Sequence, residues 1–380
     1  MRVMKTPKSL DLDITNRCNL RCTYCGHFES DGDVGHDLPK EEWLKFFEEM
    51  NRCAVTNVTL AGGEAFIRED LKELIDGIVR NRMRFGILSN GTLITDEMAS
   101  FLASTGRCDS VQVSIDGSMP ITHDTCRGKG SFVKAVNGIK HLQKHGVHVA
   151  VRVTIHRKNV HDLEAVARLL LEDFGLPGFS TNSASHMGLC RKNAEQVQLT
   201  AEERSGAMAT MLRLTAKYNG RISATAGPLA EARGWISMVK ASRGETAEPF
   251  GQGFLTGCGG MWNHIGVRAD GVMVPCCFMP HIELGRINRD DLREVWQNHP
   301  ELKKLRERCK IPLSNFDYCK DCEYISFCTG SCPALSYTVV GDVYHPSTGD
   351  CLKRFLEEGG RLPDERLLSP ESEARCGCAT

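Results

Sequence analysis

The distribution of apolar residues in the first half of the chain predicts strands that alternate with helices. Short apolar runs are typical of buried strands, and they occur at residues 10–14, 58–60, 85–88, 111–115 and 147–155, with a sixth strand expected near Phe179. The segments between them have helical spacing, and they span residues 39–50, 69–82, 95–105, 131–146 and 160–175. This alternation predicts a parallel sheet with right-handed crossovers and helices outside.

Six such units predict an α/β fold, a partial (β/α)6 TIM-like barrel, in which chemistry belongs at the carboxyl ends of the strands. We assign this barrel to residues 1–199. The rhythm breaks in residues 200–257, which combine a helical pattern with a glycine-rich stretch and are interpreted as a helical bridge. A cysteine-rich region follows at residues 258–355. The polar residues 356–380 predict a flexible tail.

Composition restricts the binding partners and the cellular location. The 380-residue chain has a formal net charge of -1, which gives no electrostatic reason to expect nucleic acid or an anionic membrane surface. The first residues lack the apolar stretch of a secretory signal, and no apolar run is long enough to span a bilayer. We therefore expect a cytoplasmic protein whose binding specificity comes from a shaped site.

The 18 cysteines indicate metal or redox chemistry, because thiols stay reduced in the cytosol and do not form structural disulfides there. Isolated cysteines often only fill space in a core, and we interpret Cys53, Cys108, Cys126 and Cys190 in this way. Close spacing in loops is harder to explain by packing, and it occurs in two arrays. These are Cys18, Cys22 and Cys25, and then Cys258, Cys276, Cys319, Cys322, Cys328, Cys332 and Cys351.

The first array reads CNLRCTYC and directly follows the first predicted strand. It offers three thiolates to an iron-sulfur cluster that needs four ligands, so one iron would remain open for a ligand that is not protein.

Three motifs together resemble the radical S-adenosylmethionine (SAM) superfamily: this CxxxCxxC loop with Tyr24 before its last cysteine, AGGEA after the second strand, and SIDG after the fourth. The resemblance implies that Cys18, Cys22 and Cys25 hold a [4Fe-4S] cluster whose fourth iron binds SAM. A non-catalytic electron carrier or iron-sulfur scaffold is disfavoured, because such a protein would need neither the GGE turn nor Tyr24.

The same resemblance implies further contacts with SAM. Gly62 and Gly63 suit a turn that approaches the methionine end closely, Glu64 is a candidate receptor for its ammonium group, and Tyr24 is a candidate contact for adenine. Other candidates are polar residues at or beyond strand ends, for which helix caps or surface positions are the alternative reading. They are Ser89, Asn90, Ser114, Arg127 and Arg152, of which the two arginines would meet the methionine carboxylate.

The second array resembles the SPASM extension of sulfatase-maturating enzymes and peptide maturases. The resemblance implies one auxiliary cluster on Cys319, Cys322, Cys328 and Cys351, and another on Cys258, Cys276 and Cys332. The fourth ligand of the latter is open between Cys277, Cys309, His264, the tail residues Cys376 and Cys378, and no protein ligand. Three [4Fe-4S] clusters, SAM and a flavodoxin or ferredoxin-type reductant are the expected cofactors and redox partner.

Cys277 is the candidate catalytic residue, as a ligand or a proton relay. It stands in VPCCFMP where sulfatase-maturating enzymes carry an aspartate as general base, which disfavours formylglycine formation.

Two substrate classes follow from this resemblance. The first is a ribosomally made peptide that receives a thioether or carbon–carbon crosslink, favoured by the SPASM array and the GSCPALSY context. Since only residues 1–9 precede the first strand, leader recognition would require a separate partner. The second is a small molecule, acted on by a dehydrogenase, an epimerase or a tetrapyrrole-modifying enzyme.

Overall fold

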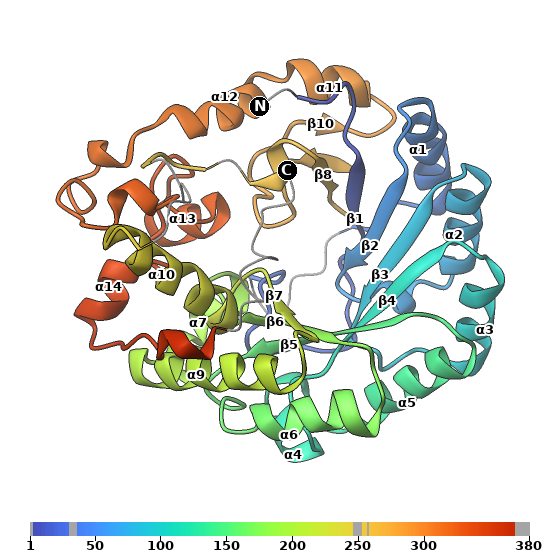
Figure 1. Cartoon of the computed structure of the whole chain (residues 1–380). Helices are drawn as coiled ribbons and strands as arrows, with labels where there is room; N and C mark the ends of the chain where they lie inside the picture. Colours follow the sequence, from blue (N-terminus) through green and yellow to red (C-terminus); the bar gives the residue numbers. More distant parts are fainter. Residues whose placement is uncertain (1–2, 30–35, 246–252, 257, 369–380) are drawn as a thin grey trace.

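A computed structural model describes residues 3–29, 36–245, 253–256 and 258–368. Within them lies one ten-stranded sheet with the order β10-β9-β8-β1-β2-β3-β4-β5-β6-β7 (Figure 1). The six predicted strands are present, parallel and in chain order, which confirms the partial barrel. They are β1 (Ser9–Thr15), β2 (Asn57–Gly62), β3 (Arg84–Ser89), β4 (Cys108–Ser114), β5 (Val149–Ile155) and β6 (Phe179–Ser183).

Helices cover the outer face of this sheet (Figure 1). On β1, Leu10, Leu12 and Ile14 are fully buried in the core beneath them. Because side chains alternate along a strand, Asp11 and Asp13 face the other way, into the barrel. The covering helices are α1 (Lys40–Arg52), α2 (Leu71–Arg80), α3 (Asp96–Ser104), α5 (Ser131–Lys144) and α6 (Leu163–Arg168), the last continued by a π-helical turn over Leu169–Asp173. A further helix, α4 (Pro120–Arg127), follows β4 and packs against α5.

The predicted helical bridge also contributes a strand. Between α9 (Ala201–Lys217) and α10 (Pro228–Ser242), β7 (Ile222–Ala224) pairs in parallel with β6. Three residues are too few for a periodic pattern, so the pairing depends on the edge that β6 offers.

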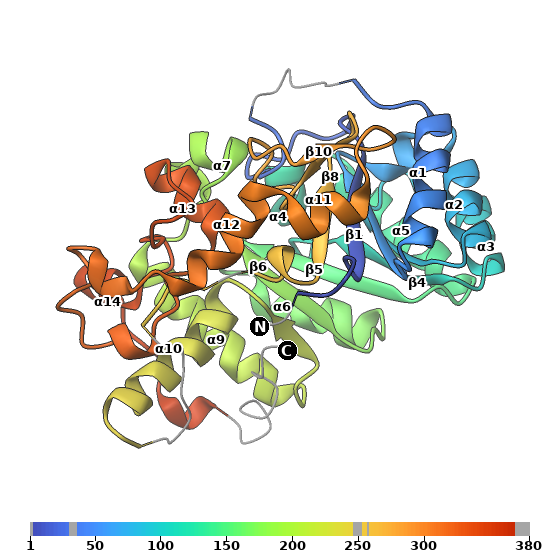
Figure 2. The same cartoon turned by 90° about the horizontal axis from the view of Figure 1, so that it is seen from above.

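The cysteine-rich region extends the same sheet at its other edge. Strand β8 (His264–Val267) pairs in parallel with β1, and β9 (Val272–Val274) and β10 (Gly285–Arg286) continue in antiparallel order. Beyond the sheet, Figures 1 and 2 show α12, α13 and α14 on the side opposite α1, α2 and α3. The remaining helices are α7 (Gly188–Lys192), α8 (Ala194–Val197), α11 (Leu292–Asn298), α12 (Pro300–Glu307), α13 (Pro333–Val340) and α14 (Leu352–Glu357).

The first part of the predicted tail is packed on the protein. The Arg361 amide donates to Ser205 Oγ at 2.9 Å, and Leu362, Leu367 and Leu368 contact the core. Cys376 and Cys378 lie outside the described residues. In the described part of the chain, no helix has the length and apolar character needed to cross a membrane.

Candidate iron-sulfur and cofactor site

The cysteine loop after β1 and the GGE turn after β2 are packed directly against each other. The Gly63 amide donates to the Thr15 carbonyl at 2.8 Å, and the Glu64 amide donates to the Arg17 carbonyl at 2.9 Å. A Cβ on Gly62, whose φ is +113°, would overlap the Thr15 carbonyl oxygen. A Cβ on Gly63 would overlap the Arg17 carbonyl oxygen and lie 3.1 Å from Cys18 Cβ. Both glycines are therefore required by the close approach of the two loops.

Glu64 ties the ends of β2 and β3 together. Its carboxylate is 1% exposed and accepts hydrogen bonds from the Asn90 amide at 2.7 Å, Ser89 Oγ at 2.8 Å and the Phe66 amide at 3.2 Å. Burial raises the pKa of this carboxyl group, while the hydrogen bonds lower it. Asn90 also donates to Asn19 Oδ1 at 2.9 Å, which links the β3 end to the cysteine loop. The contact of Glu64 with a SAM ammonium group stays a prediction.

The structure brings Cys18, Cys22 and Cys25 together. Burial, with smaller contributions from neighbouring cysteines, raises the pKa of the Cys18 thiol and raises the pKa of Cys22 to about 12. Arg127 opposes this effect at Cys22, towards which its Nη1 points at 3.9 Å. Converging, partly buried thiols ionise readily only when a cation binds them, so this donor set fits an iron-sulfur cluster.

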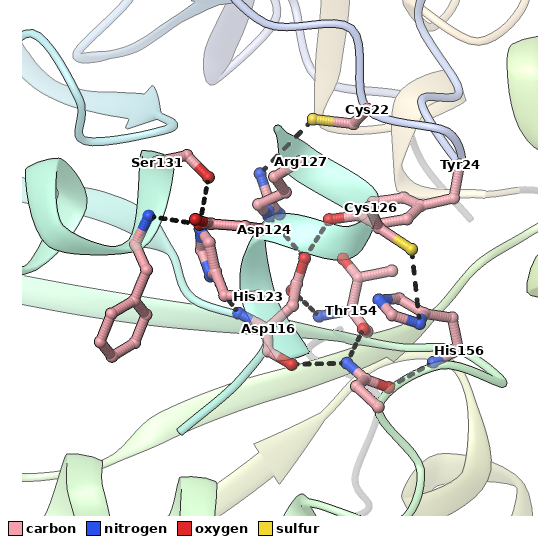
Figure 3. Close-up of polar contacts among 12 residues, drawn as sticks. Cys22, Tyr24, Asp116, His123, Asp124, Cys126, Arg127, Ser131, Thr154 and His156 are labelled. Carbon is pink, nitrogen blue, oxygen red and sulfur yellow. Dashed lines mark hydrogen bonds and ion pairs between the residues drawn. The ribbon is translucent and has the colours of Figure 1, made fainter. Parts of the chain in front are cut away.

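A buried polar network lies beneath this loop and contains a residue that the sequence reading missed, Asp116 of the SIDG motif (Figure 3). Asp116 is fully buried and accepts hydrogen bonds from Arg127 Nε at 2.5 Å, from the Thr154 amide at 2.8 Å and from the Tyr24 hydroxyl. The Arg127 cation helps hold the pKa of Asp116 below its usual range despite burial. The signal that could have found it was a carboxylate directly after a buried strand.

Tyr24 and two histidines complete this network. The Tyr24 ring lies 5.1 Å from the His156 ring, and the Arg127 guanidinium lies 5.4 Å from the Tyr24 centroid. Burial lowers the pKa of His123 and His156 to about 4, so both imidazoles are neutral. The Tyr24 hydroxyl donates to the buried Asp116 and so points into the protein. The contact of Tyr24 with adenine stays a prediction.

Ser114 and Arg152 are paired neighbours on β4 and β5. Their strand neighbours Val113 and Val151 are buried in the core, so alternation places the two polar side chains on the barrel face of the sheet. Arg152 Nε donates to Ser180 Oγ at 3.3 Å, and burial lowers the pKa of Arg152.

The second array separates into two groups of thiols. In the first, Cys258 and Cys332 raise the pKa of Cys276, although burial is the larger cause and brings it to about 12. In the second, burial raises the pKa of Cys319 to about 11, with further contributions from its three companions. Those companions are Cys328, Cys351 and Cys322. The structure thus brings together the same sets of cysteines that the resemblance to the SPASM extension implied.

The candidates for a fourth ligand near Cys258 and Cys276 differ in position. Cys277 faces β1, where its thiol donates to the Asp11 carbonyl at 4.0 Å and interacts with the carboxyl group of the buried Asp13. Cys309 is exposed and donates to the Arg306 carbonyl at 3.2 Å.

His264 lies beside the first group. A Cβ on Gly260 would be 3.2 Å from His264 Nε2 and 3.8 Å from Cys276 Cβ, and the Gly260 amide lies 3.5 Å from Cys258 Sγ. Asp11 Oδ2 is 3.8 Å from the same imidazole nitrogen.

No three Cys, His, Asp or Glu side chains in the described ranges form a site for a single metal ion. This is consistent with cluster ligands, because each thiolate of a cubane cluster binds a different iron atom, and the thiolates therefore do not converge on one point.

A groove of about 340 Å³ opens near the carboxyl ends of β5 and β6. Residues of the barrel, including Ser183 and His186, form one wall, and residues of the cysteine-rich region, including Leu335, Asp350 and Cys351, form the other.

Comparison with known families agrees with this geometry. Residues 12–170 match the family model of the Radical SAM superfamily, and residues 258–323 match SPASM, an iron-sulfur cluster-binding domain. Residues 12–170 are therefore a radical SAM domain, and residues 258–323 are a SPASM domain. These two domains imply iron-sulfur clusters and SAM.

Similar proteins act in more than one kind of pathway. The chain is 28% identical over 350 residues to the Fe-coproporphyrin III synthase of Methanosarcina barkeri, covering 87% of this chain and 84% of that protein. It is 26% identical over 333 residues to the antilisterial bacteriocin subtilosin biosynthesis protein AlbA of Bacillus subtilis, covering 85% and 67%. The crystal structure of Streptococcus suis SuiB bound to precursor peptide SuiA shares the fold, with a TM-score of 0.68, 13% identity and coverage of 92% and 77%.

Proposed function

We propose that this protein is a radical SAM oxidoreductase that installs a thioether or carbon–carbon crosslink in a ribosomally synthesised peptide. The observation that carries the proposal is the arrangement of ten cysteines into three separate groups, one at the carboxyl end of β1 and two in the SPASM region. When bound, the first cluster and SAM supply a 5'-deoxyadenosyl radical that removes a hydrogen atom from the substrate.

The residues of the barrel would then hold and orient SAM. Cys18, Cys22 and Cys25 would bind the cluster, while the Gly62–Gly63 backbone leaves room for the methionine end. Ser89, Asn90 and Glu64 form the hydrogen-bonded edge beside it. Tyr24, Ser114, Arg127 and Arg152 remain proposed contacts for the rest of the cofactor.

After the hydrogen atom is removed, forming the crosslink releases one proton and one electron from the substrate. An auxiliary iron-sulfur cluster would accept the electron, and Cys277 with Asp13 is the proposed group that receives the proton. Asp13 is 5% exposed, and His27 Nδ1 lies 3.8 Å from its carboxylate. The pair joins β1 to the SPASM loop, inside the barrel.

In the SPASM region, we propose two clusters on the two thiol groups, with His264 as the fourth ligand beside Cys258, Cys276 and Cys332. Cys319, Cys322, Cys328 and Cys351 would hold the other cluster completely.

The groove between the barrel and the SPASM region favours a peptide substrate. Polar residues that line it, such as Ser183, His186 and Asp350, can form hydrogen bonds with a peptide backbone. The similarity to AlbA supports the same reading. The similarity to Fe-coproporphyrin III synthase supports the second candidate, a tetrapyrrole or another small molecule.

The chain is divided into four parts, and two protein partners would act with it. We propose a barrel over residues 1–199, a bridge over 200–257, a SPASM domain over 258–355 and a tail over 356–380. A flavodoxin or ferredoxin-type protein would supply electrons, and a separate leader-binding protein would present the peptide.

The test is mass spectrometry of the anaerobically reconstituted enzyme with SAM, reductant and each short peptide encoded beside its gene. A peptide that loses two hydrogens, with 5'-deoxyadenosine formed in proportion, is the expected result. The Cys18/22/25→Ala variant is the control and should form neither product. If SAM is cleaved and no peptide changes mass, the small-molecule candidate replaces the peptide.

A further inference from the structure

A positively charged side chain is held against one cysteine of the first array. Arg127 Nη1 lies 3.9 Å from Cys22 Sγ, while Nε of the same guanidinium donates to Asp116 Oδ2 at 2.5 Å (Figure 3). Arg127 is the last residue of α4, and Asp116 follows β4. The two contacts use different nitrogens, so Nη1 of the guanidinium is directed at the thiol and Nε is directed at the carboxylate.

The surroundings fix this cation in place. Arg127 is 7% exposed and Asp116 is fully buried, and a buried ion pair is screened far less by water than a surface pair. Asp116 is itself held from several directions, by the Thr154 amide, by the Tyr24 hydroxyl and through its carbonyl by Asn159 Nδ2 at 2.8 Å. Two hydrogen bonds hold the carboxylate and a third holds the backbone of the same residue, so Asp116 determines where the guanidinium lies.

The position of the charge has a consequence for redox chemistry. Reduction adds one negative charge to an iron-sulfur cluster, so a nearby cation and a hydrogen bond to a ligand sulfur both stabilise the reduced state. The guanidinium contacts Cys22 directly through Nη1, whereas the Asp116 carboxylate is bound to Nε of the same guanidinium. The nearer charge of the pair is therefore positive.

We infer that Arg127, positioned by Asp116, raises the reduction potential of the cluster that Cys18, Cys22 and Cys25 would bind. The inference rests on the proposed function only in requiring that cluster. It assigns Arg127 a role towards the thiolate that is distinct from binding the methionine carboxylate.

The experiment is a redox titration of the full-length reconstituted protein without SAM, followed by electron paramagnetic resonance. The signal of the first cluster is the one absent from Cys18/22/25→Ala. Arg127→Gln is expected to shift its midpoint to a lower potential, and Arg127→Lys to recover part of the shift because the charge is kept. An unchanged midpoint in Arg127→Gln, with the signal present, overturns the inference.

The role of Asp116 is tested by a double-mutant cycle. If Asp116 positions Arg127, the shift caused by Arg127→Gln will be smaller in an Asp116→Asn background than in the parent. Equal shifts would overturn the positioning role. The double variant R127Q/D116N leaves no lone buried charge, so it is the safeguard if a single variant fails to fold; its midpoint is also expected below that of the parent.

Arg204→Gln is the matched control. Arg204 forms a comparable ion pair with the buried Glu231, Nε to Oε2 2.6 Å, but it lies on α9. Its substitution should leave the midpoint of the first cluster unchanged, and a shift as large as that of Arg127→Gln would overturn the local explanation. A parent protein without the first-cluster signal would overturn the proposed function and this inference together.

Discussion

Cys277 and Asp13 form a contact between residues that are far apart in the chain. The thiol is more than usually difficult to ionise, because burial and the neighbouring Asp13 raise its pKa well above the ordinary value. It is also tightly surrounded, since a Cβ on Gly266 would lie 3.1 Å from Cys277 Sγ. A protonated thiol beside a buried carboxylate can pass or receive a proton without exposing either group to solvent.

Replacing Cys277 by Ser tests this role. The hydroxyl occupies less volume and ionises far less readily than a thiol, so we expect crosslink formation to fall by roughly 100-fold, as for loss of a general acid or base. Slow SAM cleavage without substrate should persist. The measurement is peptide turnover by mass spectrometry beside 5'-deoxyadenosine formation. Cys190→Ser, at a buried thiol outside the three cysteine groups, is the control, and equal turnover in Cys277→Ser and the parent would contradict the role.

At the scale of elements, the site is made by loops that meet at one edge of the sheet. Because β1, β2 and β3 are parallel, the cysteine loop, the GGE turn and the Ser89–Asn90 pair leave the same edge. The hydrogen bonds of Glu64 and the close approach of Gly63 then hold these loops in register. The precision of the site comes from this packing, because a displaced loop would move its thiols.

Gly63→Ala should disturb this arrangement. The new methyl group would overlap the Arg17 carbonyl oxygen, so the two loops must separate. We expect a loss of about 1–3 kcal/mol in the free energy of unfolding, typical of overpacking, together with weaker SAM cleavage. Urea unfolding and 5'-deoxyadenosine formation are the measurements. The control is Gly206→Ala on α9, where no atom lies within 4 Å of the new methyl group; similar results for both variants would contradict the prediction.

At the scale of the whole molecule, the barrel and the SPASM region are joined through the sheet itself. Strand β8 pairs with β1, so the two regions share one sheet, with Cys258 shortly before β8 and Cys276 shortly after β9. Asp11 connects them further, because its carboxylate lies 3.8 Å from His264 Nε2 and raises the pKa of Cys276. The auxiliary groups therefore have a fixed position relative to the barrel interior.

Iron content tests this organisation. The reconstituted parent should hold about 12 iron atoms per chain, four for each cubane cluster, and Cys18/22/25→Ala should lose about four. Cys53→Ala, at a thiol packed in the core, should lose none. Iron and acid-labile sulfide analysis is the measurement. A parent value of about four would contradict the assignment of two auxiliary clusters.

The same samples test the proposed fourth ligand. If His264 binds iron, pulsed electron paramagnetic resonance of Cys18/22/25→Ala should show strong nitrogen coupling, which is lost on His264→Ala. His281→Ala is the control, because that imidazole stacks on Tyr337. Coupling that survives His264→Ala would contradict the assignment.

The sequence by itself determined the six parallel strands, the helices between them and the two cysteine arrays. These features are local: a buried strand needs a short apolar run, a helix needs apolar residues at its own spacing, and a cluster loop needs closely spaced thiols. Gly62 and Gly63 were also singled out, but for a close approach to SAM; the structure shows that they are required where the GGE turn meets the cysteine loop.

Only the tertiary structure decided the contacts between distant residues. It placed β8 beside β1, directed Cys277 towards Asp13, and brought Arg127 and Asp116 to Cys22. No local pattern encodes these pairings, because β7 and β8 are too short for a periodic signal and a single buried carboxylate resembles any loop residue until its partners surround it. Burial then strengthens the electrostatic interactions among these residues, because charges inside the protein are screened weakly.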